Sequence, residues 1–258
     1  MTAANKPSSF KVRIKRQHGP DATAHWDEFD VPYKSGMNVI STLQWIAANP
    51  KTTAGKGVEP PTWEAACLEE VCGSCTMLAN GRVRQVCAVL VDELLEDGNT
   101  ITLAPMTKFP VIRDLVVDRS RMFENLKRIK GWVPIDGTHD LGPGPTEPQD
   151  AQEERYAYSR CMTCGCCLEA CPQFTKDNQF VGAQVFAQVQ YFNMHETGRE
   201  LKDQRLDAMM GPGGINDCGN SQNCVKVCPK ELPLLTAIGK LGRATTVHAV
   251  KKFFSGKK

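Results

Sequence analysis

Four cysteines in the second half of the chain have the spacing of iron-sulfur ligands. The run reads C-M-T-C-G-C-C-L-E-A-C-P from Cys161, so that Cys164, Cys167 and Cys171 follow it and Pro172 comes last. In this spacing three thiolates bind one iron-sulfur cluster and the fourth binds a neighbouring cluster. One such run therefore predicts a second run, whose cysteines complete both ligand sets.

The second run lies downstream and contains serine where one cysteine is expected. It reads C-G-N-S-Q-N-C-V-K-V-C-P, with Ser221 in place of the second cysteine. Three thiolates favour a 3Fe-4S cluster, because oxygen is a harder and poorer ligand than thiolate for iron in a sulfide cluster. The Ser221 oxygen or a water molecule as fourth ligand is the alternative. Exchange of the last ligand between the runs gives two sets, which are Cys161, Cys164, Cys167 and Cys228 for a 4Fe-4S cluster and Cys171, Cys218 and Cys224 for the 3Fe-4S cluster.

A third group of cysteines, in the first half of the chain, predicts a 2Fe-2S cluster. Cys67, Cys72 and Cys75 have the C-x4-C-x2-C spacing of plant-type ferredoxins. Cys87 supplies the fourth thiolate from a strand predicted over residues 83–91. Gly73 lies inside the loop, where a backbone that surrounds a cluster needs unusual angles and N–H groups directed at sulfur.

These three sets account for eleven of the twelve cysteines. The remaining one, Cys166, is predicted to be a packing residue, since a buried free cysteine behaves as a small apolar side chain. Zinc or disulfides are the alternative interpretation, but zinc sites are typically built from separated C-x2-C pairs. The five histidines form no C-x-H arrangement of the Rieske type, so they are predicted to have ordinary surface or core roles.

The first half of the chain predicts a sheet with one helix. Residues 10–16 and 26–31 alternate apolar and polar side chains, which indicates a hairpin of half-buried strands. Apolar residues at helical spacing over 39–47, preceded by Asn38 as an N-cap, predict a helix. A further strand over 101–103 closes the sheet. This order is typical of a β-grasp, plant-type ferredoxin domain, which we expect over residues 1–110.

The second half predicts helices, so the expected fold class is α+β. Residues 111–258 are expected to form an all-α domain of the bacterial-ferredoxin-like, alpha-helical ferredoxin type. A loop rich in Gly and Pro over 134–148 leads to a helix over 152–160 that delivers the first cysteine run. A buried helix over 182–195 and an amphipathic, lysine-ended helix over 234–254 complete the domain. A helix face is also expected before the loop, lined by Leu115, Phe123, Leu126, Ile129 and Trp132.

Composition restricts the partners of this chain. Lys plus Arg number 31 and Asp plus Glu 29, a formal charge of +2 that predicts no nucleic-acid partner. No apolar run approaches the roughly 18 to 20 residues needed to cross a bilayer, and no secretory signal is visible. Twelve cysteines at metal-binding spacings suit a reducing compartment, so a cytoplasmic location is expected.

These motifs resemble the iron-sulfur subunit of the succinate dehydrogenase and fumarate reductase family. The resemblance covers nearly the whole chain and includes the loop 67–75, the stretch V-D-R-S-R-M-F from Val117, and both later cysteine runs. It implies that electrons leave an FAD-bearing flavoprotein subunit that oxidises succinate, pass through 2Fe-2S, 4Fe-4S and 3Fe-4S clusters, and reach quinone in a membrane-anchor cytochrome b subunit. It also implies a peripheral position on the cytoplasmic face of the cell membrane, a role in the tricarboxylic acid cycle and respiration, and no catalytic residue on this chain.

The sequence departs from ubiquinone-reducing members of that family at two positions. Those members typically place Trp soon after the first C-P and His after the first cysteine of the second run. Here Gln173 follows Pro172, and Gly219 follows Cys218. No quinone site is therefore assigned to this chain, and the pattern is more similar to menaquinone-type bacterial members.

Two other functions are kept as alternatives. A fumarate reductase subunit would use the same clusters in the reverse direction. A freestanding ferredoxin-like carrier would also use them, but a diffusible carrier rarely needs two domains and a long amphipathic tail. The lysines of that tail are interpreted as a solvated helix face, with contact to lipid headgroups or a membrane partner as the second interpretation.

Overall fold

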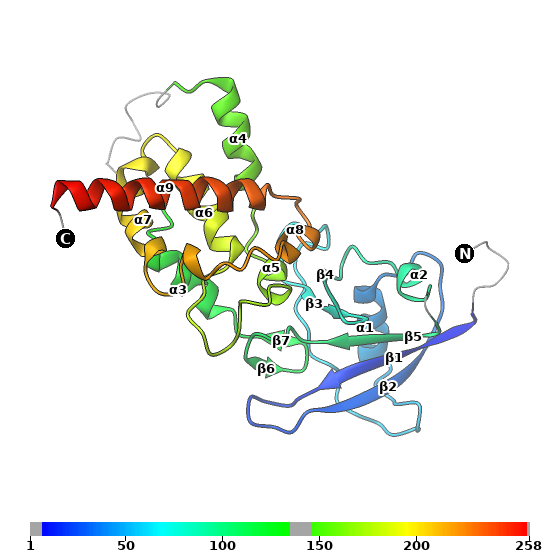
Figure 1. Cartoon of the computed structure of the whole chain (residues 1–258). Helices are drawn as coiled ribbons and strands as arrows, with labels where there is room; N and C mark the ends of the chain where they lie inside the picture. The colour runs from blue at the N-terminus through cyan, green and yellow to red at the C-terminus, as the bar shows by residue number, and fades with distance from the viewer. Residues whose placement is uncertain (1–6, 97, 135–145, 257–258) are drawn as a thin grey trace. The chain divides into compact units, whose positions relative to one another are not determined.

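The computed structural model describes residues 7–96, 98–134 and 146–256, and it divides into two compact units, Met1–Arg119 and Ser120–Lys258 (Figure 1). The first contains the main sheet and the second is helical, so the α+β content predicted from the sequence is confirmed. The division follows residue 119, later than the predicted boundary at 110. Residues 111–119 are tied to the first unit, because the N–H of Asp114 donates to the carbonyl of Gln17 (2.8 Å) and that of Leu115 to the carbonyl of Thr62 (3.2 Å).

A five-stranded sheet forms the first unit, with the order β2-β1-β5-β3-β4. β1 pairs with β2 antiparallel and with β5 parallel, and β3 pairs antiparallel with both β4 and β5. The three strands predicted over 10–16, 26–31 and 101–103 are confirmed, and β5 lies between β1 and β3. The strands are β1 (Ser9–Arg16), β2 (His25–Pro32), β3 (Thr76–Ala79), β4 (Arg82–Gln85) and β5 (Thr100–Ala104).

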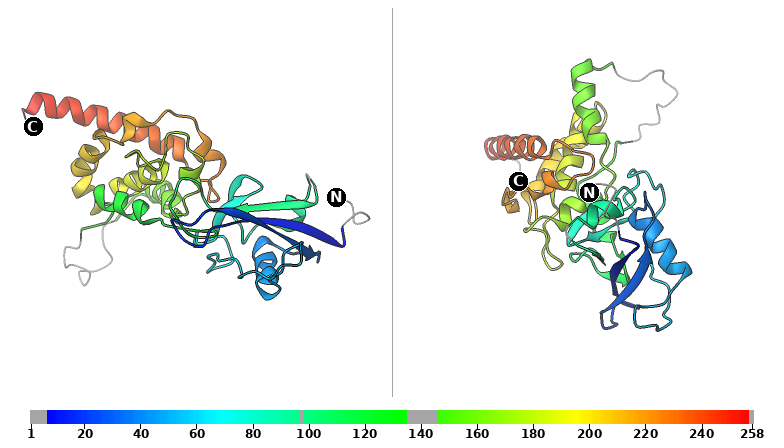
Figure 2. Two further views of the ribbon diagram at one scale, coloured as in Figure 1. Left: turned by 90° about the horizontal axis from the view of Figure 1, so that it is seen from below. Right: turned by 90° about the vertical axis from the view of Figure 1, so that its right-hand side faces the viewer.

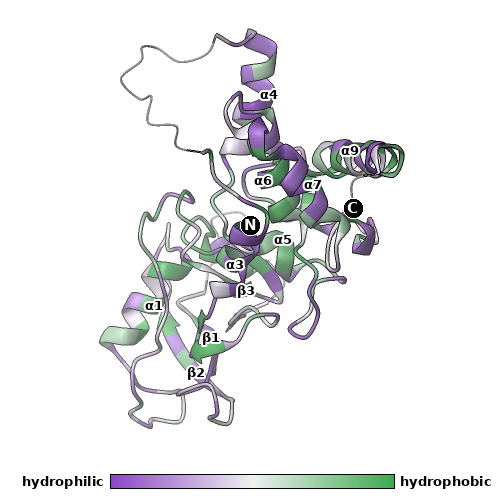
Figure 3. Ribbon diagram, turned by 90° about the vertical axis from the view of Figure 1, so that its left-hand side faces the viewer, coloured by the Kyte–Doolittle hydropathy of each residue, from purple (hydrophilic) through white to green (hydrophobic). Residues whose placement is uncertain are grey.

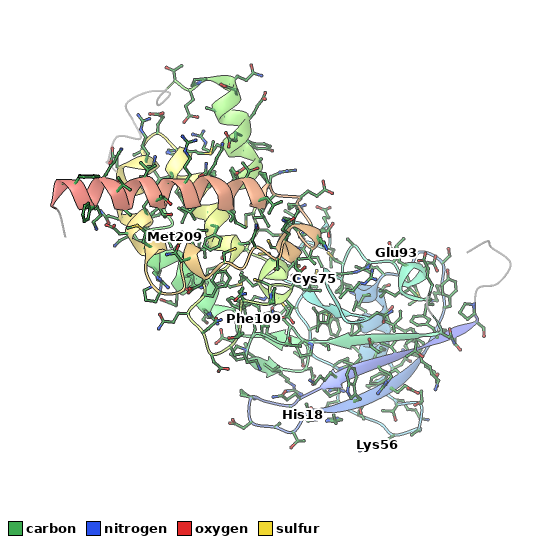
Figure 4. All side chains as sticks on the ribbon, viewed as in Figure 1. His18, Lys56, Cys75, Glu93, Phe109 and Met209 are labelled. Carbon is green, nitrogen blue, oxygen red and sulfur yellow. The ribbon has the colours of Figure 1, made fainter. Side chains whose placement is uncertain are left out.

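One helix, α1 (Val39–Ala48), packs its apolar residues into the core beside the sheet. The predicted cap is confirmed, since the Asn38 side chain accepts the N–H of Ser41 (2.8 Å) and the Ser41 hydroxyl accepts the N–H of Asn38 (3.0 Å). Alternation along β1 directs Phe10, Val12 and Ile14 into the same core. Figure 4 draws the side chains that fill this unit, among them the labelled Cys75, which directly precedes β3.

The strand predicted over residues 83–91 is wrong in its second half. β4 ends at Gln85, and the chain then forms a turn in which the N–H of Ala88 donates to the carbonyl of Gln85 and that of Val89 to the carbonyl of Val86. A short helix, α2 (Val91–Leu94), follows. Cys87 therefore lies in a turn and not on a strand, although it is buried as a ligand would be. The apolar run that suggested a strand contributes to the core through this turn.

A two-stranded ribbon, β6 (Val111–Arg113) and β7 (Val116–Val117), ends the first unit. Its turn residue Asp114 is fully buried and accepts hydrogen bonds from the Nε of Arg16 (3.0 Å) and from the N–H groups of Gln17 (3.0 Å) and Thr62 (2.9 Å). Burial raises the pKa of the Asp114 carboxyl, but these hydrogen bonds and the Arg16 charge outweigh burial and hold the pKa below its usual value. The ribbon thereby fixes the segment that leads into the first cysteine loop.

Helices make up the second unit, in which α6 packs against α3, α4 and α9 (Figure 2). The predicted helices over 152–160, 182–195 and 234–254 are confirmed. The elements are α3 (Ser120–Arg128), α4 (Gln149–Ser159), α5 (Cys166–Glu169), α6 (Ala183–Met194), η2 (Gly198–Leu201), α7 (Lys202–Met210), η3 (Ile215–Asp217), α8 (Asn223–Lys226) and α9 (Leu234–Ser255).

The helix face predicted before the loop is wrong in three of its five members. Leu115 precedes α3 in the β6–β7 turn, Trp132 follows the helix, and Phe123 is 55% exposed. The helix begins only at Ser120, so its buried positions are Met122 and Asn125, and Ile129 is buried just after its end. Most of the loop predicted over 134–148 lies outside the described residues.

Among the residues that the structure describes, none of the helices combines the length and the apolar character needed to cross a bilayer.

Candidate iron-sulfur cluster sites

The first cysteine loop directs backbone N–H groups at sulfur. The Sγ of Cys67 accepts from the N–H groups of Glu69 (3.4 Å), Val71 (3.3 Å) and Cys72 (3.3 Å). Such donors stabilise a thiolate and the sulfur atoms of a bound cluster. This arrangement fits the 2Fe-2S centre predicted from the spacing.

Unusual backbone angles produce this arrangement. Leu68 (φ 60°), Glu70 (φ 55°) and Gly73 (φ 78°) all lie in the left-handed region, and two of them are not glycine. Non-glycine residues adopt this conformation at a cost, and successive left- and right-handed residues turn their N–H groups toward one concave side. The loop is therefore shaped around a centre that its own side chains do not fill.

The other three cysteines of the set lie close to one another. The hydrogen bond between Cys72 and the Ser74 hydroxyl, followed by one with the backbone of Cys67, lowers the pKa of Cys72 to about 6. Burial, together with the neighbouring Cys87 and Cys72 thiols, raises the pKa of Cys75 to about 12. The structure thus brings Cys67, Cys72, Cys75 and Cys87 together, and a cationic centre would compensate the buried thiolate charge.

Arg119 supports this loop and was not singled out by the sequence analysis. Its guanidinium donates to the carbonyl oxygens of Gly73 (2.7 Å) and Ser74 (2.8 Å). The only sequence signal was its place in the stretch that begins at Val117. The loop is held by a residue that lies 46 and 45 positions further along the chain than the two carbonyl groups it contacts.

The four cysteines predicted to bind the 4Fe-4S cluster line one cavity of the second unit, together with Cys166. The four are Cys161, Cys164, Cys167 and Cys228, and the apolar side chains of Leu232 and Leu234 lie beside them. Burial raises the pKa of Cys161 and raises that of Cys167 well above its usual value, and the neighbouring thiols of the same set add to both effects. The predicted exchange of Cys228 into the set of the first run therefore agrees with where the structure puts this side chain.

The remaining three cysteines form a neighbouring group. Burial raises the pKa of Cys224, and the nearby Cys171 and Cys218 thiols raise it further, against the lowering effect of a backbone hydrogen bond. Cys224 in turn contributes to the raised pKa of Cys167, so the two groups lie next to each other.

The two cysteine runs have the same backbone conformation. In the first run, Thr163 (φ 55°) and Gly165 (φ 91°) flank Cys164 in the left-handed region. In the second, Asn220 (φ 50°) and Gln222 (φ 61°) flank Ser221 in the same way. Each run then begins a short helix, α5 or α8. The backbone at Ser221 thus keeps the conformation found at Cys164. The second run differs from the first at this position in its side chain and not in the shape of its loop.

Comparison with known proteins gives these sites a family. Residues 11–124 match the model of a 2Fe-2S iron-sulfur cluster binding domain, and residues 157–232 match that of a 4Fe-4S dicluster domain. The chain is 50% identical over 250 residues to the succinate dehydrogenase iron-sulfur subunit of Bacillus subtilis, covering 97% of this chain and 98% of that protein. It belongs to the family of succinate dehydrogenase and fumarate reductase iron-sulfur subunits.

Other members of the family are more distant. The fumarate reductase iron-sulfur subunit of Wolinella succinogenes is 30% identical over 223 residues, which is 85% of this chain and 89% of that protein. A chain of the Mycobacterium smegmatis Sdh1 complex in the apo form superposes with a TM-score of 0.76 at 22% identity, over 96% of this chain and 98% of that one. The structural match supports the fold over almost the full length.

Gln173 and Gly219, the two departures noted in the sequence, lie next to each other in the structure. A Cβ atom at Gly219 would lie 2.6 Å from the Nε2 of Gln173, so the glutamine side chain occupies the space next to position 219. The contacting atom is the end of a flexible side chain, so Gln173 fills this space without excluding a larger residue at position 219.

None of the twelve cysteines, all of which are described, is in a disulfide. Cys166 is 1% exposed, as predicted for a packing residue, and it also lines the cavity of the first run. Within the described ranges no three His, Cys, Asp or Glu side chains are placed to bind a single metal ion. The ligands of an iron-sulfur cluster are shared among two or more iron atoms, so they need not converge on one point.

Proposed function

We propose that this chain is the iron-sulfur electron-transfer subunit of a succinate:quinone oxidoreductase. In this role it relays electrons from an FAD-bearing flavoprotein subunit to quinone, which we infer to be menaquinone, at a membrane-anchor cytochrome b subunit. The observation that carries the proposal is the gathering of eleven cysteines into three groups, each with the composition that its spacing predicted. When bound, the clusters supply reversible one-electron chemistry at potentials set by their surroundings.

The chain itself supplies position, thiolate ligands and hydrogen bonds. We assign Cys67, Cys72, Cys75 and Cys87 to 2Fe-2S, the set of Cys161, Cys164, Cys167 and Cys228 to 4Fe-4S, and the set of Cys171, Cys218 and Cys224 to 3Fe-4S. The N–H groups around Cys67 stabilise negative charge on sulfur. The apolar residues beside the second set keep water away from it. No residue of the chain is assigned a role in succinate chemistry.

The 3Fe-4S assignment depends on Ser221. Ser221 is exposed, and three thiols form this site, whereas four form the neighbouring one. A cluster that lacks a thiolate at one corner tends to lose that iron, since a hydroxyl oxygen is a poorer ligand. Ser221 is therefore a neighbour of the cluster and not a ligand in this proposal.

The fold names follow from the same reasoning. A mixed sheet with α1 packed beside it and a cysteine loop before β3 supports a β-grasp, plant-type ferredoxin domain. Short helices that begin inside repeated cysteine runs support an alpha-helical ferredoxin domain. We infer a peripheral position on the cytoplasmic face of the cell membrane, held by the partner subunits.

The test is purification of the native complex through a tag on this chain. We expect a flavoprotein and a membrane subunit to copurify, succinate-dependent quinone reduction, and about nine irons per chain from clusters of two, four and three irons. Low-temperature EPR of the oxidised complex should show a three-iron signal. Cys75→Ser should lose the 2Fe-2S signal, whereas Cys166→Ala, the matched control, should retain all three centres. A colourless, zinc-containing preparation or the absence of a flavoprotein would contradict the proposal.

The reverse reaction is the second candidate. Fumarate reduction is supported by similarity to fumarate reductase subunits, such as the one from Wolinella succinogenes at 30% identity. The 50% identity to a succinate dehydrogenase subunit gives stronger support to succinate oxidation. The ratio of succinate oxidation to fumarate reduction by the purified complex, measured with quinones of different potential, distinguishes the two directions.

A further inference from the structure

The C-terminal helix α9 has an unusual distribution of charge. Its 22 residues contain Lys240, Arg243, Lys251 and Lys252 but no Asp or Glu. One face of the helix is buried in the second unit through residues that include Leu241, and its last turns extend beyond the neighbouring helices in Figure 1 and in the left view of Figure 2. The exposed side of this end is therefore cationic.

The same end carries a second apolar face. Val247, Val250 and Phe254 recur at intervals of three and four residues, which places them on one side of the helix, away from the buried positions. They are 46%, 51% and 82% exposed, and Phe253 beside them is also 82% exposed. The two phenylalanine rings contact each other edge to face, with centroids 5.4 Å apart. In Figure 3 hydrophobic and hydrophilic residues alternate around this helix.

A cationic groove lies beside these apolar residues. It has a volume of about 650 Å³ and is bounded by α7 and α9. Five of its lining residues carry a positive charge and one, Asp203, carries a negative charge. The nearby Asp207 is already paired, since it contacts the Nε2 of His248 (3.0 Å) and the Nζ of Lys252 (2.9 Å). The cations are Lys202, Lys240, Arg243, Lys251 and Lys252.

We propose that the last three turns of α9 bind directly to an anionic phospholipid bilayer. The exposed valines and the phenylalanine pair enter the boundary between headgroups and acyl chains, and the cations of the groove contact lipid phosphates. Exposed aromatic residues at the end of a cationic helix are typical of segments that lie in a membrane interface, and an anionic membrane surface attracts each Lys or Arg close to it. Exposed apolar side chains bordered by polar residues are typical of protein or membrane interaction sites.

This inference goes beyond the proposed function, because it requires lipid contact by this chain without the membrane-anchor subunit. Charge complementarity favours a lipid surface over an apolar protein groove as the partner. The cations beside the apolar residues can contact anionic headgroups while the apolar residues contact acyl chains. The chemistry involved is binding alone, and no cluster takes part in it.

The experiment is flotation of the full-length, cluster-containing chain with vesicles of phosphatidylcholine alone or mixed with phosphatidylglycerol. We expect binding to the mixed vesicles that is weakened by salt, and little binding to the neutral ones. Phe253→Ala with Phe254→Ala should lower the partition coefficient at least tenfold. Arg243→Gln with Lys251→Gln, two residues for which the structure gives no ion pair, should lower it about 25-fold for anionic vesicles only.

Phe123→Ala is the matched control, because Phe123 is also an exposed phenylalanine of the second unit. It should leave vesicle binding unchanged. Equal binding by the parent chain and the phenylalanine variant, or equal binding to neutral and anionic vesicles, would overturn the proposal. The proposal would also be overturned if the parent chain bound no vesicles and the variants failed to assemble with the membrane subunit. In that case the surface would be a protein interface. Succinate-dependent reduction of a soluble acceptor by the variant complexes is measured separately, so that failure of lipid binding is distinguished from failure of electron transfer.

Discussion

The buried carboxylate of Asp114 provides a quantitative test of how the first cysteine loop is supported. Asp114→Asn removes one negative charge from a pair in which both side chains are almost fully buried, Asp114 at 0% and Arg16 at 1% exposure. The amide keeps one oxygen as an acceptor but presents an NH₂ group to the N–H of Thr62, so one charge-assisted hydrogen bond is lost. Such a bond contributes roughly 1.5 to 3 kcal/mol.

The charge left behind adds to this cost. Breaking a buried ion pair from one side typically costs about 3 to 5 kcal/mol, but Arg16 retains Asp27 at 2.9 Å, which reduces the penalty. We therefore expect the variant to lose about 3 kcal/mol of unfolding free energy at pH 7. Asp30→Asn is the matched control, since Asp30 is exposed on β2 and the same change there should fall within about 0.5 kcal/mol.

The assay is urea unfolding of the chain followed by tryptophan fluorescence, because Trp45 and Trp63 pack against the core of the first unit. The pKa of Asp114 is lowered in the folded state, so its contribution is present above the unfolded pKa, about 3.9, and is lost as the pH falls through the folded pKa. The difference between parent and variant should therefore shrink below about pH 4. A variant as stable as the parent at pH 7, or a difference that does not change with acid, would refute the reasoning.

Three other predictions concern the cluster sites and their supports. Ser221→Cys should add one iron per chain and replace the oxidised three-iron EPR signal with that of a four-iron cluster, because the backbone already has the conformation found at Cys164; an unchanged three-iron signal would contradict this. Arg119→Ala should lower the free energy of unfolding by about 2 kcal/mol, because two hydrogen bonds to the cluster loop are lost. It should also speed the loss of the 2Fe-2S visible absorption in the presence of a chelator, and Arg119→Lys should recover part of the effect. Equal rates of loss in the parent and both variants would contradict this prediction. Gly213→Ala should destabilise the second unit by more than about 3 kcal/mol. The residue has φ +75°, and the new Cβ would lie 1.9 Å from a backbone carbonyl oxygen. A melting temperature within a few degrees of the parent's would contradict this prediction.

Local patterns predicted the elements that local forces set. The strands around Phe10 and the capped helix after Asn38 follow from alternation and capping, which involve residues close in sequence. The predicted strand beyond Gln85 failed because a turn and a short helix satisfy the same backbone groups while burying the same apolar residues. The helix face with Phe123 failed because periodicity does not indicate where a preceding ribbon ends.

The cysteine sets illustrate the same division. Spacing alone predicted three sets and the exchange of ligands between runs, because thiolate positions in a short loop are fixed by covalent distance. The sequence also predicted unusual backbone angles in the first loop, at Gly73, but not that Leu68 and Glu70 adopt them. It did not predict the partners of Arg119, since these depend on a contact between distant segments. The substitution at Ser221 was visible in the sequence, whereas the retained backbone around it was not.

The amino-acid sequence by itself determined the type of chemistry and the number of candidate cluster sites, because these depend on which residues are present and how far apart they lie along the chain. The tertiary structure alone decided that Asp114 and Arg16 support the first cysteine loop, that Gln173 fills the space beside Gly219, and that Phe253 and Phe254 remain uncovered. These features arise where segments remote in sequence meet or fail to meet, and only packing in three dimensions sets them.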